Sequence, residues 1–137
     1  MIRVAPVACF LLLATSCLPR TETWRVEPVP STAAVPDPHT SVLAVIERVV
    51  EQHGFVASGG TPGCTREWRR TVSRNARFGA SSADATVCAD YSIAGVITVH
   101  LVERIPANQA WSAAADSLRT ALTDSLAPWG GRAGRAR

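Results

Sequence analysis

Apolar residues recur with the period of a helix just after residue 40. The apolar positions are Val42, Val45, Ile46, Val49 and Val50, which stand at i, i+3, i+4, i+7 and i+8. This spacing predicts an amphipathic helix that packs one face on a core. Thr40 or Ser41 can cap its start. Gly54 is expected to end it, because glycine readily adopts the left-handed conformation found after helices.

A second stripe with steps of three and four predicts a helix near the C-terminus. Its positions are Trp111, Ala115, Leu118, Leu122, Ser125 or Leu126, and Trp129. Asn108 is a candidate N-cap, and Pro128, Gly130 and Gly131 are expected to end the helix. The basic segment 130–137 is then expected to be a disordered tail.

Between the helices the period changes to two. Alternation of apolar and polar residues predicts strands over 85–93 and 96–104, joined into a hairpin at Ala94 and Gly95. Residues 65–73 are a further candidate strand, and Phe55 to Ser58 a short one. "GGTPG", residues 59–63, is expected to be a loop. No connection is long enough for a helical crossover, so the sheet should be antiparallel.

These elements predict an α+β domain over residues 40–129. The expected order is a helix, a three- or four-stranded antiparallel sheet and a helix, with both helices on one face and the other face open to solvent or a partner. Five prolines lie between residues 18 and 39. At that density, residues 17–39 are expected to form an extended tether that reaches up to about 70 Å, with Trp24 exposed on it.

The N-terminal pattern is that of an export signal. An apolar run from Val4 to Ser16 follows Arg3. It is shorter than the roughly 20 residues that a membrane-spanning helix needs, so residues 1–16 are interpreted as a signal peptide. The sequence Ala14-Thr15-Ser16-Cys17 resembles the lipobox of bacterial lipoproteins.

The resemblance to the lipoprotein class covers residues 1–17 and carries no information about the fold. It implies cleavage before Cys17, acylation of Cys17 and anchoring to a membrane of the cell envelope. Leu18 after the cysteine implies the periplasmic face of the outer membrane, where the organism has one.

The other cysteines agree with export. Cys9 leaves with the signal, and three of the four cysteines remain. If Cys17 is acylated, Cys64 and Cys88 are left to form a disulfide. Closing that loop is worth about 3.5 kcal/mol in the chain-entropy model. The alternative is three free thiols in a reducing compartment.

No pattern of catalytic or metal-binding residues emerges. His39, His53 and His100 lack metal-ligand spacing, and "GGTPG" lacks the lysine and following helix of a phosphate loop. Asp90, Ser92 and His100 can approach one another in the hairpin, but without a nucleophile elbow they are better explained as solvated polar residues of strands. We therefore expect no enzyme, cofactor or metal.

Arginines gather in residues 66–77 of a chain that has a formal net charge of +3 and no lysine. They are Arg66, Arg69, Arg70, Arg74 and Arg77. Guanidinium groups bind phosphate and carboxylate in a bidentate manner, so this arginine patch is a candidate contact for an envelope protein or an anionic envelope polymer. Nucleic acid is not expected outside the cytoplasm. Alternatively, the charges only protect a strand edge from aggregation.

Three functions follow as hypotheses, and an enzyme is the least supported of them because no acid, base and nucleophile converge. The first is a membrane-anchored exported lipoprotein whose small non-catalytic domain contacts another envelope component. The second is an inhibitor or immunity-type binder of a hydrolase, which would insert a protruding loop, residues 58–65 or 74–84, into a cleft.

Overall fold

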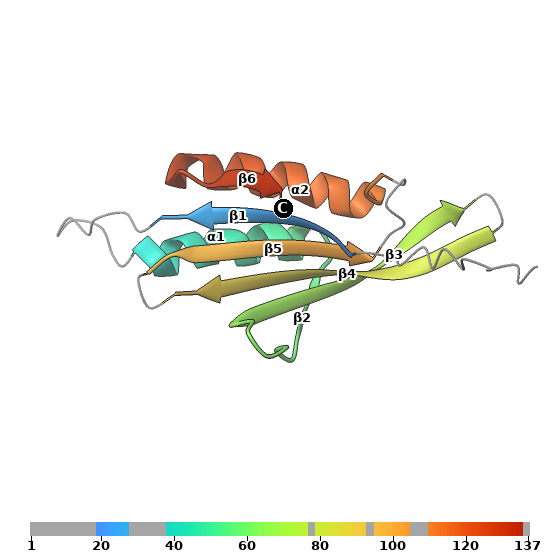
Figure 1. Cartoon of the computed structure of the whole chain (residues 1–137), viewed down its shortest axis with the longest axis horizontal. Coiled ribbons are helices and arrows are strands. Elements are labelled where there is room, and N and C mark those ends of the chain that lie inside the picture. Colours follow the sequence, from blue (N-terminus) through green and yellow to red (C-terminus); the bar gives the residue numbers. More distant parts are fainter. Residues whose placement is uncertain (1–18, 28–37, 77–78, 93–94, 105–109, 136–137) are drawn as a thin grey trace, which may run out of the picture.

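The computed structural model describes residues 19–27, 38–76, 79–92, 95–104 and 110–135, and for 38–41, 73–76, 79–83 and 135 the backbone alone. Two helices cover a six-stranded sheet in the order β2-β3-β4-β5-β1-β6, in which all neighbours are antiparallel (Figure 1). The α+β class is thus confirmed, and the sheet is larger than predicted. The elements are β1 (Pro19–Val26), α1 (Pro38–Gln52), β2 (Val56–Ser58), β3 (Arg66–Ala76), β4 (Gly79–Tyr91), β5 (Ile97–Arg104), α2 (Ala113–Leu126), the short 3-10 helix η1 (Ala127–Trp129) and β6 (Arg132–Arg135).

The prediction of a tether is wrong for residues 19–26. They form strand β1, which pairs with β5 from Pro19 opposite Arg104 to Val26 opposite Ile97. Pro19 is tolerated because it is the first residue of the strand. Trp24, expected to be exposed, is fully buried. The proline-rich composition concealed an alternation in which Trp24 and Val26 face the core.

The prediction of a disordered tail is also wrong for residues 132–135. They form β6, which pairs with Glu22 to Arg25 of β1. The segment Arg-Ala-Gly-Arg has no apolar periodicity, so its pairing comes from the backbone groups that the edge of β1 offers. The folded unit therefore includes strands on both sides of the predicted domain 40–129.

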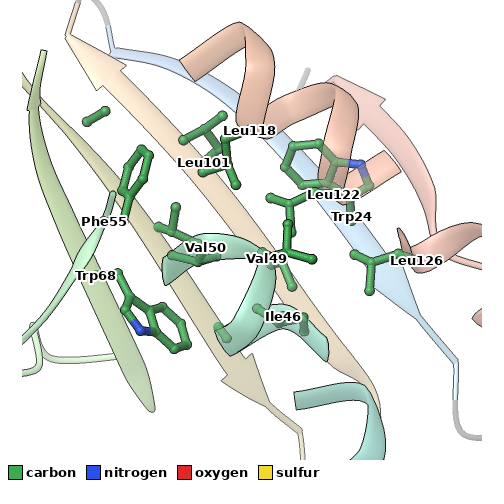
Figure 2. Packing of buried hydrophobic residues seen from close by; sticks show 14 of the residues in the cluster. Trp24, Ile46, Val49, Val50, Phe55, Trp68, Leu101, Leu118, Leu122 and Leu126 are labelled. Atoms are coloured by element: carbon green, nitrogen blue, oxygen red, sulfur yellow. The ribbon is translucent and has the colours of Figure 1, made fainter. Parts of the chain in front are cut away.

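Both helices pack on the same face of the sheet, over one hydrophobic core (Figure 2). The predicted stripe of α1 is confirmed, since Val42, Ile46, Val49 and Val50 are buried. Gly54 adopts a φ of 77° after this helix, as its predicted role requires. In α2 the buried residues are Ala115, Leu118, Leu122 and Leu126.

The N-cap of α2 is Ser112, not Asn108. The Ser112 hydroxyl accepts a hydrogen bond from the amide of Ala115 at 3.2 Å, and the helix begins at Ala113. Asn108 lies outside the described residues. The apolar stripe does not locate the start of the helix because Trp111, on the same stripe, precedes the cap.

Strands β3 and β4 continue beyond the rest of the sheet as a two-stranded arm (Figure 1). The pairing of β4 with β5 begins at Ala85, opposite Glu103. Residues 71–76 therefore pair only with residues 79–84, and these two segments are called the β3/β4 arm. At about 3.3 Å per residue the arm extends roughly 20 Å past the sheet.

Candidate functional site

The helices leave one face of the sheet uncovered, which we call the open face. In β5, Ile97, Val99, Leu101 and Glu103 are buried under the helices, whereas Thr98, His100 and Val102 point to the other side. Residues directly opposite each other in an antiparallel pair lie on the same face. Polar residues dominate the open face, in keeping with contact to solvent or a polar partner.

One row of the open face crosses four strands. Glu67, Cys88, His100 and Thr23 stand opposite one another in β3, β4, β5 and β1. His100 Nδ1 and the hydroxyl of Thr23 lie 2.9 Å apart and form a hydrogen bond. The row places a histidine directly between a threonine and a cystine, which the period-two pattern of each strand alone could not show.

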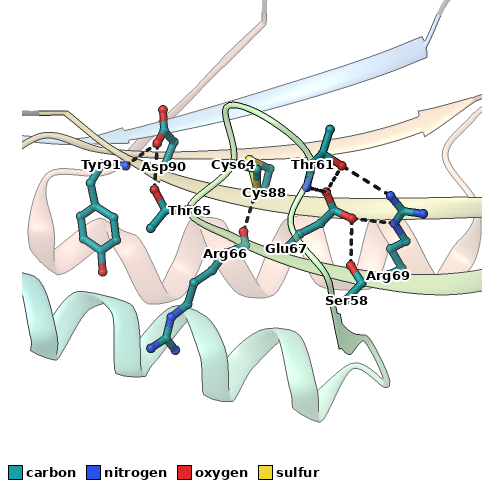
Figure 3. Close-up of a disulfide and its surroundings, with 10 residues drawn as sticks. All are labelled: Ser58, Thr61, Cys64, Thr65, Arg66, Glu67, Arg69, Cys88, Asp90 and Tyr91. Atoms are coloured by element: carbon teal, nitrogen blue, oxygen red, sulfur yellow. Dashed lines mark hydrogen bonds and ion pairs between the residues drawn. A yellow bond between two sulfur atoms is a disulfide. The ribbon is translucent and has the colours of Figure 1, made fainter.

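The predicted disulfide between Cys64 and Cys88 is present (Figure 3). The two Cα atoms lie 5.6 Å apart, within the range that a disulfide requires. Cys64 belongs to the loop that precedes β3, and Cys88 lies in β4, two strands in from the edge of the sheet. The bond therefore fastens the loop 59–65 to the open face.

Glu67 of β3 holds the same loop through hydrogen bonds to Thr61. Its carboxylate accepts hydrogen bonds from the Ser58 hydroxyl at 2.8 Å, the Arg69 Nε at 2.7 Å and the Thr61 amide at 3.2 Å, and from the Thr61 hydroxyl (Figure 3). Although Glu67 lies on the open face, it is only 4% exposed. The hydrogen bond from the Thr61 hydroxyl, helped by Ser58 and Arg69 and opposed by burial, lowers the pKa of Glu67 from 4.5 to about 2.

A third attachment lies at the end of the loop. The Thr65 hydroxyl donates a hydrogen bond to Asp90 at 3.0 Å, and the same carboxylate oxygen accepts one from the Tyr91 amide at 2.8 Å. With the bonds at Thr61 and Cys64, the loop is held at three points. It is a fixed cover over one side of the open face and does not protrude.

Three arginines of the predicted patch have described side chains, and these three lie on two different faces of β3. Successive residues of β3 point to opposite faces. Arg66 binds Glu47 of α1 at 2.8 Å, and Arg70 donates to the carbonyl of His53, so both lie on the helix side. Arg69 lies on the open face beside Glu67.

For the other two arginines of the patch, Arg74 and Arg77, the structure describes no side chain. Only the backbone of Arg74 is described, within β3, and Arg77 lies outside the described residues. Cys17, the predicted lipidation site, also lies outside them. A linear cluster of arginines in a strand is divided between two faces, so the local sequence overstates the charge that one surface carries.

Asp90, Ser92 and His100 are each hydrogen-bonded to other groups. Asp90 binds Thr65 and Tyr91, and the Ser92 hydroxyl accepts from the Val96 amide at 3.1 Å. His100 is hydrogen-bonded to Thr23. Over the residues that the structure describes, no group of three or more histidine, cysteine, aspartate or glutamate side chains could hold a metal ion.

A pocket of about 530 Å³ lies where β1 begins, beside the start of α2. The Arg20 guanidinium carbon lies 5.7 Å from the ring centroid of Trp111, within the range of a cation–π contact. Arg119 binds Asp116 at 2.7 Å and Glu22 at 3.2 Å. The hydrogen bond to Asp116 is the largest cause that raises the pKa of Arg119 above its usual value, and the charge of Glu22 adds to it. The sequence pattern did not indicate this pocket, because Arg20 and Glu22 lie in the proline-rich region that predicted a tether.

The chain matches no protein-family model and shows no significant similarity to a curated protein sequence. In the described part of the chain, neither helix is long and apolar enough to cross a membrane.

Proposed function

We propose that this protein is an exported, membrane-anchored lipoprotein whose small non-catalytic domain binds another component of the cell envelope. The observation that carries the proposal is the bond between Cys64 and Cys88. Disulfides persist in oxidising compartments such as the periplasm. The bond also uses two of the three cysteines that follow the proposed signal peptide, which leaves Cys17 for acylation.

The open face is the proposed contact surface. The loop 59–65 covers its side near β2 and β3, and the strands β4, β5 and β1 carry side chains such as Thr86, Thr98 and Thr21 on the rest. A broad surface that carries several hydroxyl groups suits a protein partner that forms hydrogen bonds across it. The arginine patch supports this role less well, because Arg66, Arg69 and Arg70 are engaged on two different faces.

The first test is the intact mass of the mature protein from its native membrane fraction, with thiol labelling before and after reduction. We expect a chain that begins at Cys17 with the added mass of acyl chains, and two thiols that appear only on reduction. A Cys17→Ser variant should lack the acyl mass and keep the disulfide. A chain that retains residues 1–16, or that carries three reactive thiols, would overturn the proposal.

The contact surface can be tested by site-specific photocrosslinking in cells. A photoreactive amino acid replaces Thr98 of β5, on the open face, or Thr120, an exposed residue of α2 on the opposite side of the molecule. We expect an envelope protein to crosslink at position 98 and not at position 120. Equal crosslinking at both positions would contradict recognition by the open face.

The β3/β4 arm favours a second candidate function, an inhibitor-type binder of a hydrolase. Of the two segments predicted to protrude, the loop 59–65 is bonded to the sheet, whereas the arm extends past it. Val72 stands opposite Ala83 within the arm. Residues 73–82 can therefore be replaced by Asn-Gly. This two-residue turn connects Val72 and Ala83 as a tight β-hairpin and removes most of the arm.

This shortened variant separates the two functions. Loss of partner capture in the shortened variant, with a folded domain, would favour the inhibitor-type binder. Retained capture would favour the open face.

A further inference from the structure

We infer that the domain lies directly on the membrane surface, with the Arg20–Trp111 end of the molecule in the headgroup region of the bilayer. The inference rests on the proposed acylation of Cys17. It replaces the predicted tether of about 70 Å, because the residues assigned to that tether are a strand inside the sheet.

The distance from the anchor to the folded domain follows from covalent geometry. Only Leu18 separates Cys17 from Pro19, and consecutive Cα atoms are about 3.8 Å apart. Whatever conformation Leu18 adopts, the Cα of Cys17 lies within about 7.6 Å of the Cα of Pro19. Pro19 is fixed opposite Arg104, in a strand flanked by β5 and β6. Acyl chains on Cys17 therefore hold this corner of the sheet against the bilayer.

The side chains at this corner suit the membrane interface. Trp111 is half-buried, and the guanidinium of Arg20 lies over its ring. Tryptophan is enriched at the level of the headgroups, and arginine binds phosphate oxygens in a bidentate manner. Arg104, directly opposite Pro19, is exposed. An aromatic ring and two guanidinium groups thus lie next to the point where the lipid would be attached.

The charges of the pocket agree with this arrangement. The positive charge of Arg119 is paired with the carboxylates of Asp116 and Glu22, so its guanidinium stays in contact with the protein. Arg104 is exposed on the side of the anchor, whereas Arg20 stands opposite the buried Glu103 and lies over the ring of Trp111. The β3/β4 arm leaves the sheet at the same end, since Ala85 stands opposite Glu103, next to Arg104. The arm is about 20 Å long, so with this end at the headgroups it has to lie along the bilayer surface.

Two tryptophans allow the orientation to be measured. Trp111 precedes α2 and Trp129 follows it, and both are half-buried. They flank the 14 residues of α2, which at 1.5 Å per residue span roughly 21 Å. Trp24 and Trp68 are buried in the core, at 0% and 2% exposure, and are out of reach of a quencher in lipid.

The experiment uses the mature, acylated protein, extracted from its native membranes. It is reconstituted into vesicles of phosphatidylethanolamine and phosphatidylglycerol that carry a nitroxide near the headgroup. Tryptophan fluorescence is measured for the wild type, Trp111→Phe and the matched Trp129→Phe. We expect quenching in the wild type and in Trp129→Phe, and a loss of most of it in Trp111→Phe. A long glycine-serine insert between Leu18 and Pro19 should also abolish most of the quenching.

The outcomes distinguish the inference from the function on which it rests. Acyl mass without quenching, or quenching that Trp111→Phe does not reduce, would overturn the membrane-facing orientation and leave the lipoprotein proposal standing. Absence of acyl mass would overturn both. Undiminished quenching with the insert would show that the short connection to Pro19 does not set the orientation. Labelling of Cys64 and Cys88 only after reduction serves as the check that each variant is folded.

Discussion

Trp24 of β1 donates its indole N–H to the Thr123 hydroxyl of α2 at 3.1 Å, across 99 positions of sequence. The bond joins a strand from the proline-rich N-terminal region to the last helix. Trp24 and Trp68 are the largest fully buried side chains of the core. The N-terminal segment is thus an integral part of the domain.

Replacement of Trp24 by alanine is expected to lower the free energy of unfolding by about 3–5 kcal/mol, because it empties a large space in the core. Thr123→Val, which removes the hydroxyl that accepts from Trp24 and donates to the Arg119 carbonyl, should cost about 1–3 kcal/mol. Urea denaturation of each variant measures these two losses in the free energy of unfolding. Trp129→Ala, at a half-buried site, is the control and should cost clearly less than Trp24→Ala. Equal, small losses for the two tryptophans would indicate that residues 19–26 do not pack in the sheet.

Reduction of the bond between Cys64 and Cys88 is expected to lower the free energy of unfolding by about 3.5 kcal/mol. The loss should be largest for the loop 59–65 and the neighbouring strands, since the disulfide joins these parts. Amide hydrogen exchange of the oxidised and reduced protein measures it. The Cys64→Ser/Cys88→Ser double variant should behave like the reduced protein. A uniform increase in exchange over both helices and the sheet would contradict this expectation.

Stability should depend on pH through Glu67. Its pKa is about 2 in the folded protein and 4.5 as an ordinary glutamate, so the unfolded chain binds its proton first as the pH falls. The stabilisation is complete above pH 4.5 and is lost progressively toward pH 2. Its size is about 3 kcal/mol, since one pKa unit corresponds to about 1.4 kcal/mol.

The measurement is urea denaturation at a series of pH values between neutral and about 2. Glu67→Gln should remove most of the acid-dependent change. Glu51→Gln, at an exposed position of α1, should leave the change as it is in the wild type. A Glu67→Gln profile parallel to the wild type would show that the carboxylate is not held by Thr61 and Ser58.

Ser112→Ala is expected to cost about 1 kcal/mol, because the Ser112 hydroxyl satisfies the amide of Ala115 at the start of α2. Asn108→Ala should change stability by less than about 0.5 kcal/mol. Thermal unfolding of the two variants compares the observed cap with the one that the sequence predicted. A larger loss at Asn108 than at Ser112 would contradict the observed start of the helix.

What the sequence determined by itself is local. The stripe of α1 from Val42 to Val50, the stripe of α2 from Ala115 to Leu126 and the hairpin of β4 and β5 were predictable, because each rests on periodicity within one segment. The pairing of Cys64 with Cys88 was predictable from the number of cysteines and the proposed fate of Cys17.

The tertiary structure decided what depends on partners far along the chain. Residues 19–26 form a strand because they pair with β5, and residues 132–135 form a strand because they pair with β1. A local sequence pattern does not show which strand edges are available for pairing. The arginines of β3 are divided between two faces because side chains alternate along a strand. Glu67 is buried on an open face because a loop, held by Cys88 and Asp90, folds over it. Periodicity identifies which residues avoid water, whereas strand neighbours and loop position are settled by long-range hydrogen bonds that form only when the whole sheet assembles.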